Sequence, residues 1–166
     1  VDFGDATITV TYPAGCGSPT RGIFSGGYTP TATNVMNFIT FSTTGNAADF
    51  GDLAQVQSAT NSASNAVRGF TIAGKDSSGN RSDDTTTFII ATLGSSVSSV
   101  EILANSSAGG ASSSPTRIVF AGGNPSNFTS IEYKQIDTDG GFIDFGDLTS
   151  TSANTGATSN GHGGLG

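Results

Sequence analysis

The chain of 166 residues carries 13 acidic and 6 basic side chains, which give it a formal net charge of −7. This balance disfavours nucleic-acid binding, which requires clustered lysine and arginine to neutralise phosphate. No apolar run approaches the ~18 residues of a membrane-spanning helix, and a single cysteine, Cys16, excludes an internal disulfide framework. The length fits one domain of ordinary size.

Short alternating segments predict a β protein. Residues 7–11 alternate between polar and apolar side chains as a half-buried strand does, and further strands are predicted at 22–25, 35–41 and 53–57. The Thr- and Pro-rich segment 28–34 predicts an exposed loop between two of these strands. No stretch shows the spacing of an amphipathic helix, whereas eleven Phe and many Ile and Val recur at regular positions. This pattern favours a packed β core over disorder.

One tetrapeptide sets the period of the chain. Asp-Phe-Gly-Asp stands at residues 2–5, 49–52 and 144–147, a first step of 47 residues (from 2 to 49) and a second of 95 (from 49 to 144). Such a period indicates a repeat architecture, with a degenerate copy, Ser-Ser-Val-Glu, at 98–101. We expect Phe to anchor in the core, Gly to supply an unusual backbone angle and Asp to bond turn amides. The marker residues are Asp2, Phe3, Asp5, Asp49, Phe50, Asp52, Asp144, Phe145 and Asp147.

Two further markers keep the same phase. Arg21, Arg68 and Arg117 each lead a short apolar run that ends in glycine, and an alternating segment in each unit leads to a later glycine. We expect each arginine to make a charge-assisted bond to an Asp of the tetrapeptide; the alternative is a ring of positive groups facing a channel or an anionic sugar. The repeats are 2–48, 49–97, 98–143 and a partial unit, 144–166.

A unit of about 47 residues suits one four-stranded propeller blade. The apolar strands that end in Gly-Gly within 21–27 and 117–123, followed by a loop, an alternating strand and a Gly turn, resemble the kelch repeat of β-propellers. The chain lacks the Trp of that pattern, and the tetrapeptide is foreign to it. Together with the glycine-rich residues 160–165, the tetrapeptide is similar to repeat proteins of tailed phages of marine and freshwater bacteria. This resemblance implies a virion structural or appendage protein.

The sequence does not decide how the repeats close into a complete fold. Three and a half repeats do not close a propeller, which has about four to eight blades, and open ends leave unpaired strand edges. Several copies can complete a ring, or the chain can be part of a longer one. A β-prism with pseudo-threefold symmetry or a strand-exchanged fibre subunit would also cover these edges.

The sequence offers little chemistry. No catalytic residue set emerges, so we expect neither enzymatic activity nor a cofactor. Asp137, Asp139 and Asp144 have acidic spacing that a calcium site can use, although Asp-rich turns occur without metal. His162, the only histidine, has no second His or cysteine cluster to form a metal site.

These features predict a structural or adhesive component of a virion appendage, capsid decoration or extracellular filament, located in a virion or outside the cell. A rigid scaffold displays loops at 28–34, 75–84 and 124–127. Tyr28, Lys75 and Asn127 are expected to contact a surface glycan or a partner subunit. Expected partners are further copies of the chain, a glycan or other virion subunits. A lectin-like module is the alternative, and a glycan-degrading propeller, which needs two carboxylates in one pocket, is a third.

Overall fold

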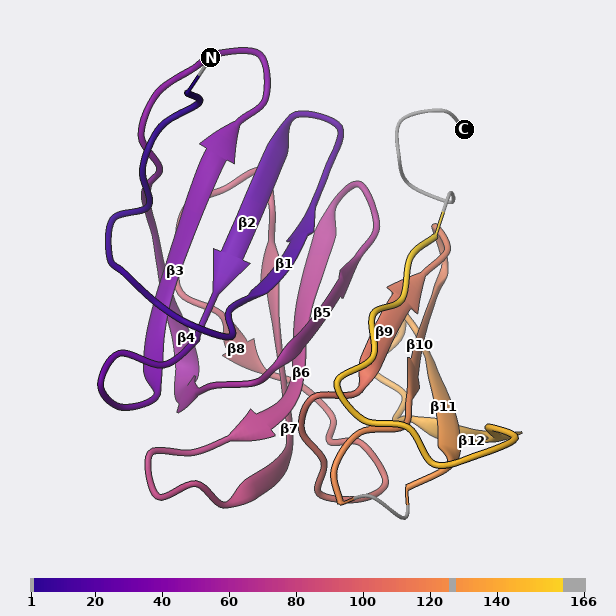
Figure 1. Ribbon diagram of the computed structural model, residues 1–166. Coiled ribbons are helices and arrows are strands. Elements are labelled where there is room, and N and C mark those ends of the chain that lie inside the picture. Colours follow the sequence, from indigo (N-terminus) through magenta and orange to yellow (C-terminus); the bar gives the residue numbers. More distant parts are fainter. Residues whose placement is uncertain (1, 126–127, 160–166) are drawn as a thin grey trace.

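The computed structural model describes residues 2–125 and 128–159 (Figure 1). The described residues form an all-β fold of three four-stranded antiparallel sheets, and they contain no helix able to cross a membrane. Sheet 1 contains β1 (Ala14–Gly17), β2 (Arg21–Ser25), β3 (Thr33–Thr40) and β4 (Ala48–Gln57). Sheet 2 contains β5 (Asn61–Ser64), β6 (Arg68–Lys75), β7 (Arg81–Ile89) and β8 (Val97–Ser98). Sheet 3 contains β9 (Gly110–Ser113), β10 (Arg117–Ala121), β11 (Ser130–Gln135) and β12 (Ile143–Asp147).

Within each sheet the strands are neighbours in chain order. The strands predicted at 22–25, 35–41 and 53–57 fall largely within β2, β3 and β4. The strand predicted at 7–11 is wrong, because only Thr11 forms a bridge, to Tyr28. These residues correspond in the repeat to the end of β4, where Gln57 pairs with Thr33. No described strand lies where it could pair in this way with residues 7–11.

Most of the loop predicted at 28–34 lies between β2 and β3, although β3 begins at Thr33, and the loop predicted at 75–84 is shorter. There β6 continues to Lys75 and β7 begins at Arg81, so that a tight turn replaces the longer loop. Residues 126–127 of the loop predicted at 124–127 lie outside the described residues.

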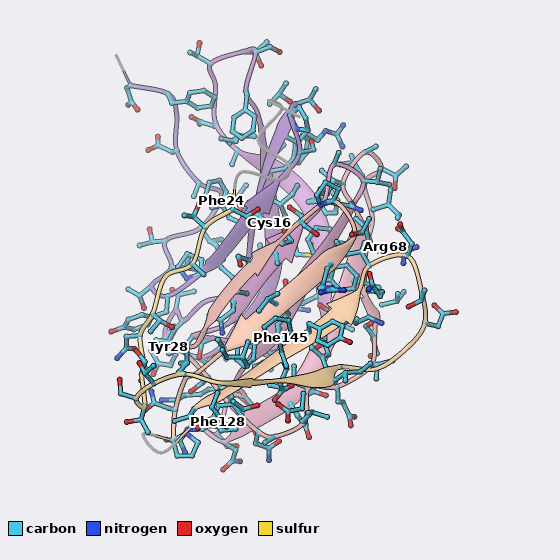
Figure 2. All side chains as sticks on the ribbon, turned by 90° about the vertical axis from the view of Figure 1, so that its right-hand side faces the viewer. Cys16, Phe24, Tyr28, Arg68, Phe128 and Phe145 are labelled. Atoms are coloured by element: carbon cyan, nitrogen blue, oxygen red, sulfur yellow. The ribbon has the colours of Figure 1, made fainter. Side chains whose placement is uncertain are left out.

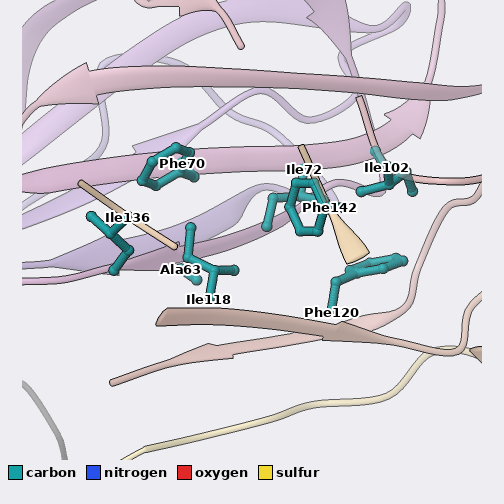
Figure 3. Packing of buried hydrophobic residues seen from close by; sticks show 9 residues of the cluster. Ala63, Phe70, Ile72, Ile102, Ile118, Phe120, Ile136 and Phe142 are labelled. Atoms are coloured by element: carbon teal, nitrogen blue, oxygen red, sulfur yellow. The ribbon is translucent and has the colours of Figure 1, made fainter. Parts of the chain in front are cut away.

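Two hydrophobic cores lie between successive sheets. We call the face of a sheet that packs on the following sheet its leading face, and the opposite face its trailing face. The core between sheets 1 and 2 contains Ile23, Met36, Phe50, Leu53, Phe88 and Ile90. The core between sheets 2 and 3 contains Ala63, Phe70, Ile72, Ala73, Ile102, Ile118, Phe120, Ile136 and Phe142 (Figure 3). No core of described residues joins sheet 3 to sheet 1.

The first strands of the three sheets, β1, β5 and β9, contact one another side by side. Serine side chains join them. The Ser64 hydroxyl donates to the Gly17 carbonyl (2.6 Å) and accepts a bond from the Gly17 amide (3.1 Å). The Ser113 hydroxyl donates to the Ser64 carbonyl (2.6 Å). Because each serine bonds the equivalent position of the preceding sheet, one polar contact is repeated along the stack.

The tetrapeptide at 49–52 joins sheet 1 to sheet 2. The Gly94 amide donates to the Phe50 carbonyl (2.8 Å), and the Ser96 amide donates to the Asp52 carbonyl (2.8 Å). The backbones approach so closely that a Cβ on Gly51 would lie 2.6 Å from the Gly94 carbonyl carbon. Gly51 also has φ +137°, a conformation that favours glycine. The glycine is therefore required by both conformation and space.

The tetrapeptide at 2–5 makes the same contacts with the equivalent turn of sheet 1. The Gly45 amide donates to the Phe3 carbonyl (2.8 Å), and the Ala47 amide donates to the Asp5 carbonyl (2.8 Å). The expected Asp-to-amide bond is confirmed for the first Asp of each copy, whereas no such bond is found for the second Asp among the described residues. Asp2, Asp49 and Asp144 each accept a bond, at 3.0–3.2 Å, from the glycine amide two residues later.

The expectation that Phe anchors in the core is confirmed for one copy and wrong for two. Phe50 is 2% exposed and packs edge to face against Phe38 and Phe88. Phe3 is 38% exposed and Phe145 is 59% exposed. Only Phe50 lies between two complete sheets, so only Phe50 is covered.

The degenerate copy at 98–101 lies in register with the others. Ser98 pairs with Thr86 as Asp49 pairs with Asn37. By this register Ser99 takes the place of Phe50, and Lys134 takes that of Phe88. The buried Lys134 ammonium donates to the carbonyls of Thr138 (3.1 Å) and Gly140. Burial lowers the pKa of Lys134, and the aromatic pair is replaced by a hydroxyl and an amine that bonds its own turn.

A pair of glycine substitutions separates backbone strain from contact between sheets. Gly51 and Gly146 have φ of +137° and +138°, but a Cβ on Gly146 would meet nothing within 4 Å. We expect Gly51→Ala to lower the free energy of unfolding by about 1–3 kcal/mol more than Gly146→Ala does. The reason is that the added Cβ meets backbone atoms at position 51 but not at position 146. Denaturant unfolding of both variants measures this difference, and equal losses would contradict the contact.

Candidate functional site

The loops of all three sheets meet around one open hollow of about 980 Å³. Polar residues and two tyrosines line it together with apolar atoms, and they come from the ends of the second strands and from the links between sheets. The residues used below are Tyr12, Tyr28, Lys75, Asp76, Asn124 and Asn154.

One position at or just beyond the end of the second strand of each sheet is fixed in the same way. Its amide donates to a carbonyl in the segment that leads into that sheet, at 2.8 Å each time. The pairs are Tyr28 with Thr11, Lys75 with Ser58, and Asn124 with Ser107. The backbone is thus constant, while the side chains differ between an aromatic ring, an amine and an amide.

A second repeated feature lies in the wall of the hollow. The non-glycine residues Tyr12, Ala59, Ala108 and Asn154 have φ between +51° and +56°, which is uncommon for such residues. The Ala108 amide donates to the Ala59 carbonyl (2.9 Å), and the Asn154 amide donates to the Ala108 carbonyl (2.7 Å). Backbone bonds between successive sheets therefore hold these turns in place.

The side chains at the hollow suit a polar ligand with apolar faces. Tyr12 is 72% exposed and Tyr28 is 49% exposed. Tyrosines combine an apolar ring with a polar tip, and Lys75 adds a positive charge nearby. Asp76 accepts bonds from the Asn80 amide (2.9 Å), the Asn80 side chain (3.1 Å) and the Ser78 amide (2.8 Å). These bonds, chiefly those of Asn80, lower the pKa of Asp76, which stays ionised.

Of the three predicted contact residues, Tyr28 and Lys75 both line the hollow. Asn127 lies outside the described residues. The equivalent position in sheet 3 is Asn124, which sequence reasoning missed. It could have been found by counting from the glycine, because Asn124 follows Gly123 as Tyr28 follows Gly27.

The arginine prediction was wrong about the partner. Arg21 donates to the carbonyls of Ile90 (2.9 Å) and Ala91 (3.0 Å) in the following sheet, and Arg68 donates to the Ile136 carbonyl (2.9 Å). The guanidinium groups thus reach backbone carbonyls at the end of a third strand rather than an Asp of the tetrapeptide.

Arg117 lacks such a carbonyl among the described residues. Its guanidinium carbon lies 4.6 Å from the ring centre of Tyr133, as that of Arg21 lies 4.9 Å from the ring centre of Phe38. The stacking is therefore repeated in sheet 3, whereas the bond to a following sheet is not.

The proposed calcium ligands Asp137, Asp139 and Asp144 do not form a cluster in the described part of the chain. Three other acidic groups, Asp83, Asp84 and Glu101, have oxygens within 4.8 Å of one another. The Asp84 carboxylate in this group already accepts bonds from protein donors, among them Gln55 (3.0 Å) and Ser82 (2.8 Å). We assign no metal to either set.

The environment of Cys16 disfavours the thiolate form. Burial raises its pKa to about 12, although a hydrogen bond with Ser64 acts in the opposite direction. Because the thiolate is the nucleophile, we expect Cys16 to react with a disulfide reagent at pH 8 much more slowly in the folded chain than in the unfolded chain. Equal rates in buffer and in denaturant would contradict this.

The turn around Asp76 gives a pH prediction. We expect the Asp76 carboxyl, followed by NMR, to titrate below the usual range, because its ionised form accepts three hydrogen bonds. Asn80→Ala removes the side-chain donor and should raise this pKa. Ser77→Ala, in the same turn, should leave it unchanged. Since the pKa is lowered on folding, the bonds are complete at neutral pH and are lost as pH falls through it.

Comparison with known proteins assigns the chain to no family. No protein-family model matches its sequence, and no curated protein matches it either. The geometry of the described residues therefore carries the functional interpretation.

Proposed function

We propose that the chain is a structural or adhesive scaffold whose sheets are kelch-like propeller blades and whose loops contact other molecules. Its setting is a virion appendage, a capsid decoration or an extracellular filament, and its role is structural rather than enzymatic. The observation that carries the proposal is that recurring and variable residues of the repeat have different locations. Residues that recur in the repeats hold sheets together through backbone and arginine bonds, while side chains that differ surround an open hollow.

The recurring residues support the scaffold half of the proposal. The tetrapeptides at 2–5 and 49–52 bond the turn of an adjacent sheet through backbone amides and carbonyls. Arg21 and Arg68 bond carbonyls of the following sheet. Residues used in this way serve assembly of the sheets, and a four-stranded antiparallel sheet in chain order is the form of a propeller blade.

The residues at the hollow support the second part of the proposal, in which loops contact other molecules. Tyr28, Lys75 and Asn124 share one backbone position and one backbone bond, yet their side chains differ. Loops on a rigid scaffold are common sites of binding because they vary without disturbing the core.

A glycan is the ligand that the hollow favours, which keeps a lectin-like module as the second candidate. Tyr12 and Tyr28 are exposed beside amide and hydroxyl groups, and a sugar ring offers an apolar face together with hydroxyls. A glycan-degrading role has less support. Asp76 is the single carboxylate among the described residues of the wall, and its oxygens are bonded to its own turn.

Tyr28→Ala tests whether ligand binding by the loops is independent of the stability of the scaffold. We expect this variant to keep its free energy of unfolding within about 0.5 kcal/mol of the parent, as exposed substitutions do, and to lose the glycans that the parent captures on an array. Phe41→Ala is the matched control, because Phe41 is an exposed aromatic residue beyond the opposite end of β3. It should leave capture unchanged. A parent chain that captures no glycan would contradict the lectin-like candidate, and global unfolding of Tyr28→Ala would contradict the scaffold.

A further inference from the structure

The segment at 2–5 occupies the place of a fourth strand in a sheet that precedes sheet 1. Phe3 and Asp5 accept bonds from the Gly45 turn as Phe50 and Asp52, in β4, accept bonds from the Gly94 turn. In Figure 1 this indigo segment runs along sheet 1.

Residues 154–159 occupy the place of a first strand in a sheet that follows sheet 3. The Asn154 amide bonds Ala108 as the Ala108 amide bonds Ala59. Residues 156–159 read Gly-Ala-Thr-Ser, and β9 (Gly110–Ser113) reads Gly-Ala-Ser-Ser. The two run close together, since a Cβ on Gly110 would lie 3.0 Å from the Thr155 hydroxyl.

These two partial sheets are one and the same. A small hollow of about 170 Å³ is lined by residues of all four first-strand positions, among them Cys16, Ser64, Ser113 and Ala157. Figure 2 shows the yellow C-terminal segment in front of the sheets, and the hollow brings Ala157 near Cys16. Because all four first-strand positions line this one hollow, the sheet after sheet 3 takes the place of the sheet before sheet 1. Four is the smallest usual number of propeller blades.

The second and third strand positions of this fourth sheet are unfilled by described residues. A groove of about 680 Å³ lies between the N-terminal segment and the trailing face of sheet 1, lined by Phe3, Val10, Phe24 and Ile39. The equivalent space between sheets 1 and 2 is filled by a hydrophobic core.

The leading face of sheet 3 is likewise not packed against a following sheet of described residues. Phe145 is exposed, although it packs edge to face on Tyr133 as Phe50 does on Phe38. A Cβ on Gly146 would meet nothing, whereas one on Gly51 would strike the Gly94 turn. Within the described ranges, Arg117 lacks the carbonyl that Arg21 and Arg68 bond.

We propose that the wedge between sheets 3 and 1, bounded by Phe145 on one side and by Phe3 and Phe24 on the other, binds a β-hairpin of the repeat's own second- and third-strand type. Its first strand pairs with residues 154–159 and its second with residues 2–5. A Gly turn after the second strand donates amides to the carbonyls of Phe145 and Asp147. The carbonyl at the end of that strand accepts the bond from Arg117, and both faces of the hairpin are buried.

The internal junction between sheets 1 and 2 argues for this occupant. There the hairpin β6–β7 with its Gly94 turn covers the tetrapeptide at 49–52, which is identical to that at 144–147. Addition of strands to open edges is a known mode of peptide recognition. The inference rests on the scaffold half of the proposed function, and does not depend on whether the loops bind a glycan.

A synthetic peptide with the sequence of residues 68–96, labelled with a fluorophore, is the probe. We expect saturable 1:1 binding to the full chain by fluorescence anisotropy. Gly146→Ala should weaken this binding at least tenfold, because its Cβ would strike the Gly turn of the peptide. The space around Gly146 in the free chain is open, and circular dichroism of the variant confirms that it is folded.

Two controls complete the experiment. A peptide with Gly94→Val should bind at least tenfold more weakly, and the Tyr28→Ala chain should bind the parent peptide as the wild type does. Absence of binding, or equal affinity for Gly146→Ala and wild type, would overturn the proposal. Self-association of the chain that is abolished by Gly146→Ala and blocks the peptide would also overturn it, by assigning the wedge to a second copy.

Discussion

The backbone bond from the Gly94 amide to the Phe50 carbonyl is the contact on which the stacking of the sheets depends. Side chains normally keep the backbones of packed sheets about 10 Å apart. Here glycine at 51 removes the side chain at the point of contact, and the two backbones bond directly. The same bond joins the Gly45 amide to the Phe3 carbonyl, so two copies of the tetrapeptide contact a neighbouring turn through the backbone.

Comparison of the interface between sheets 1 and 2 with that between sheets 2 and 3 shows which contacts vary. Between sheets 2 and 3, Val100 stands where Gly51 stands in sheet 1, and the aromatic pair is replaced by Ser99 and Lys134. The serine contacts of β1, β5 and β9 are kept in both junctions. The inner edges of the sheets are therefore held by one constant set of bonds. At the outer edges the glycine contact between sheets 1 and 2 has no equivalent among the described residues between sheets 2 and 3, where the buried Lys134 bonds its own turn.

The sequence predicted the repeat, the β class and the positions of most strands, because periodic apolar residues and glycines act locally. It also predicted two of the residues at the hollow, Tyr28 and Lys75. It could not predict the carbonyl partners of Arg21 and Arg68, since backbone acceptors leave no mark in side-chain identity. The exposure of Phe145 depends on whether a sheet follows it, which its identical motif does not reveal. The strand predicted at 7–11 failed for the same reason, because alternation does not supply a partner.

Hydrogen exchange at the Gly94 amide tests this glycine contact most directly. Gly94 lies in an exposed turn, so the bond to the Phe50 carbonyl is its source of protection. The equivalent Gly140 amide faces the degenerate copy and has no such bond among the described residues. The contact predicts slow exchange at Gly94, comparable to strand amides, and fast exchange at Gly140. Equally fast exchange at both amides would contradict a backbone bond between the sheets.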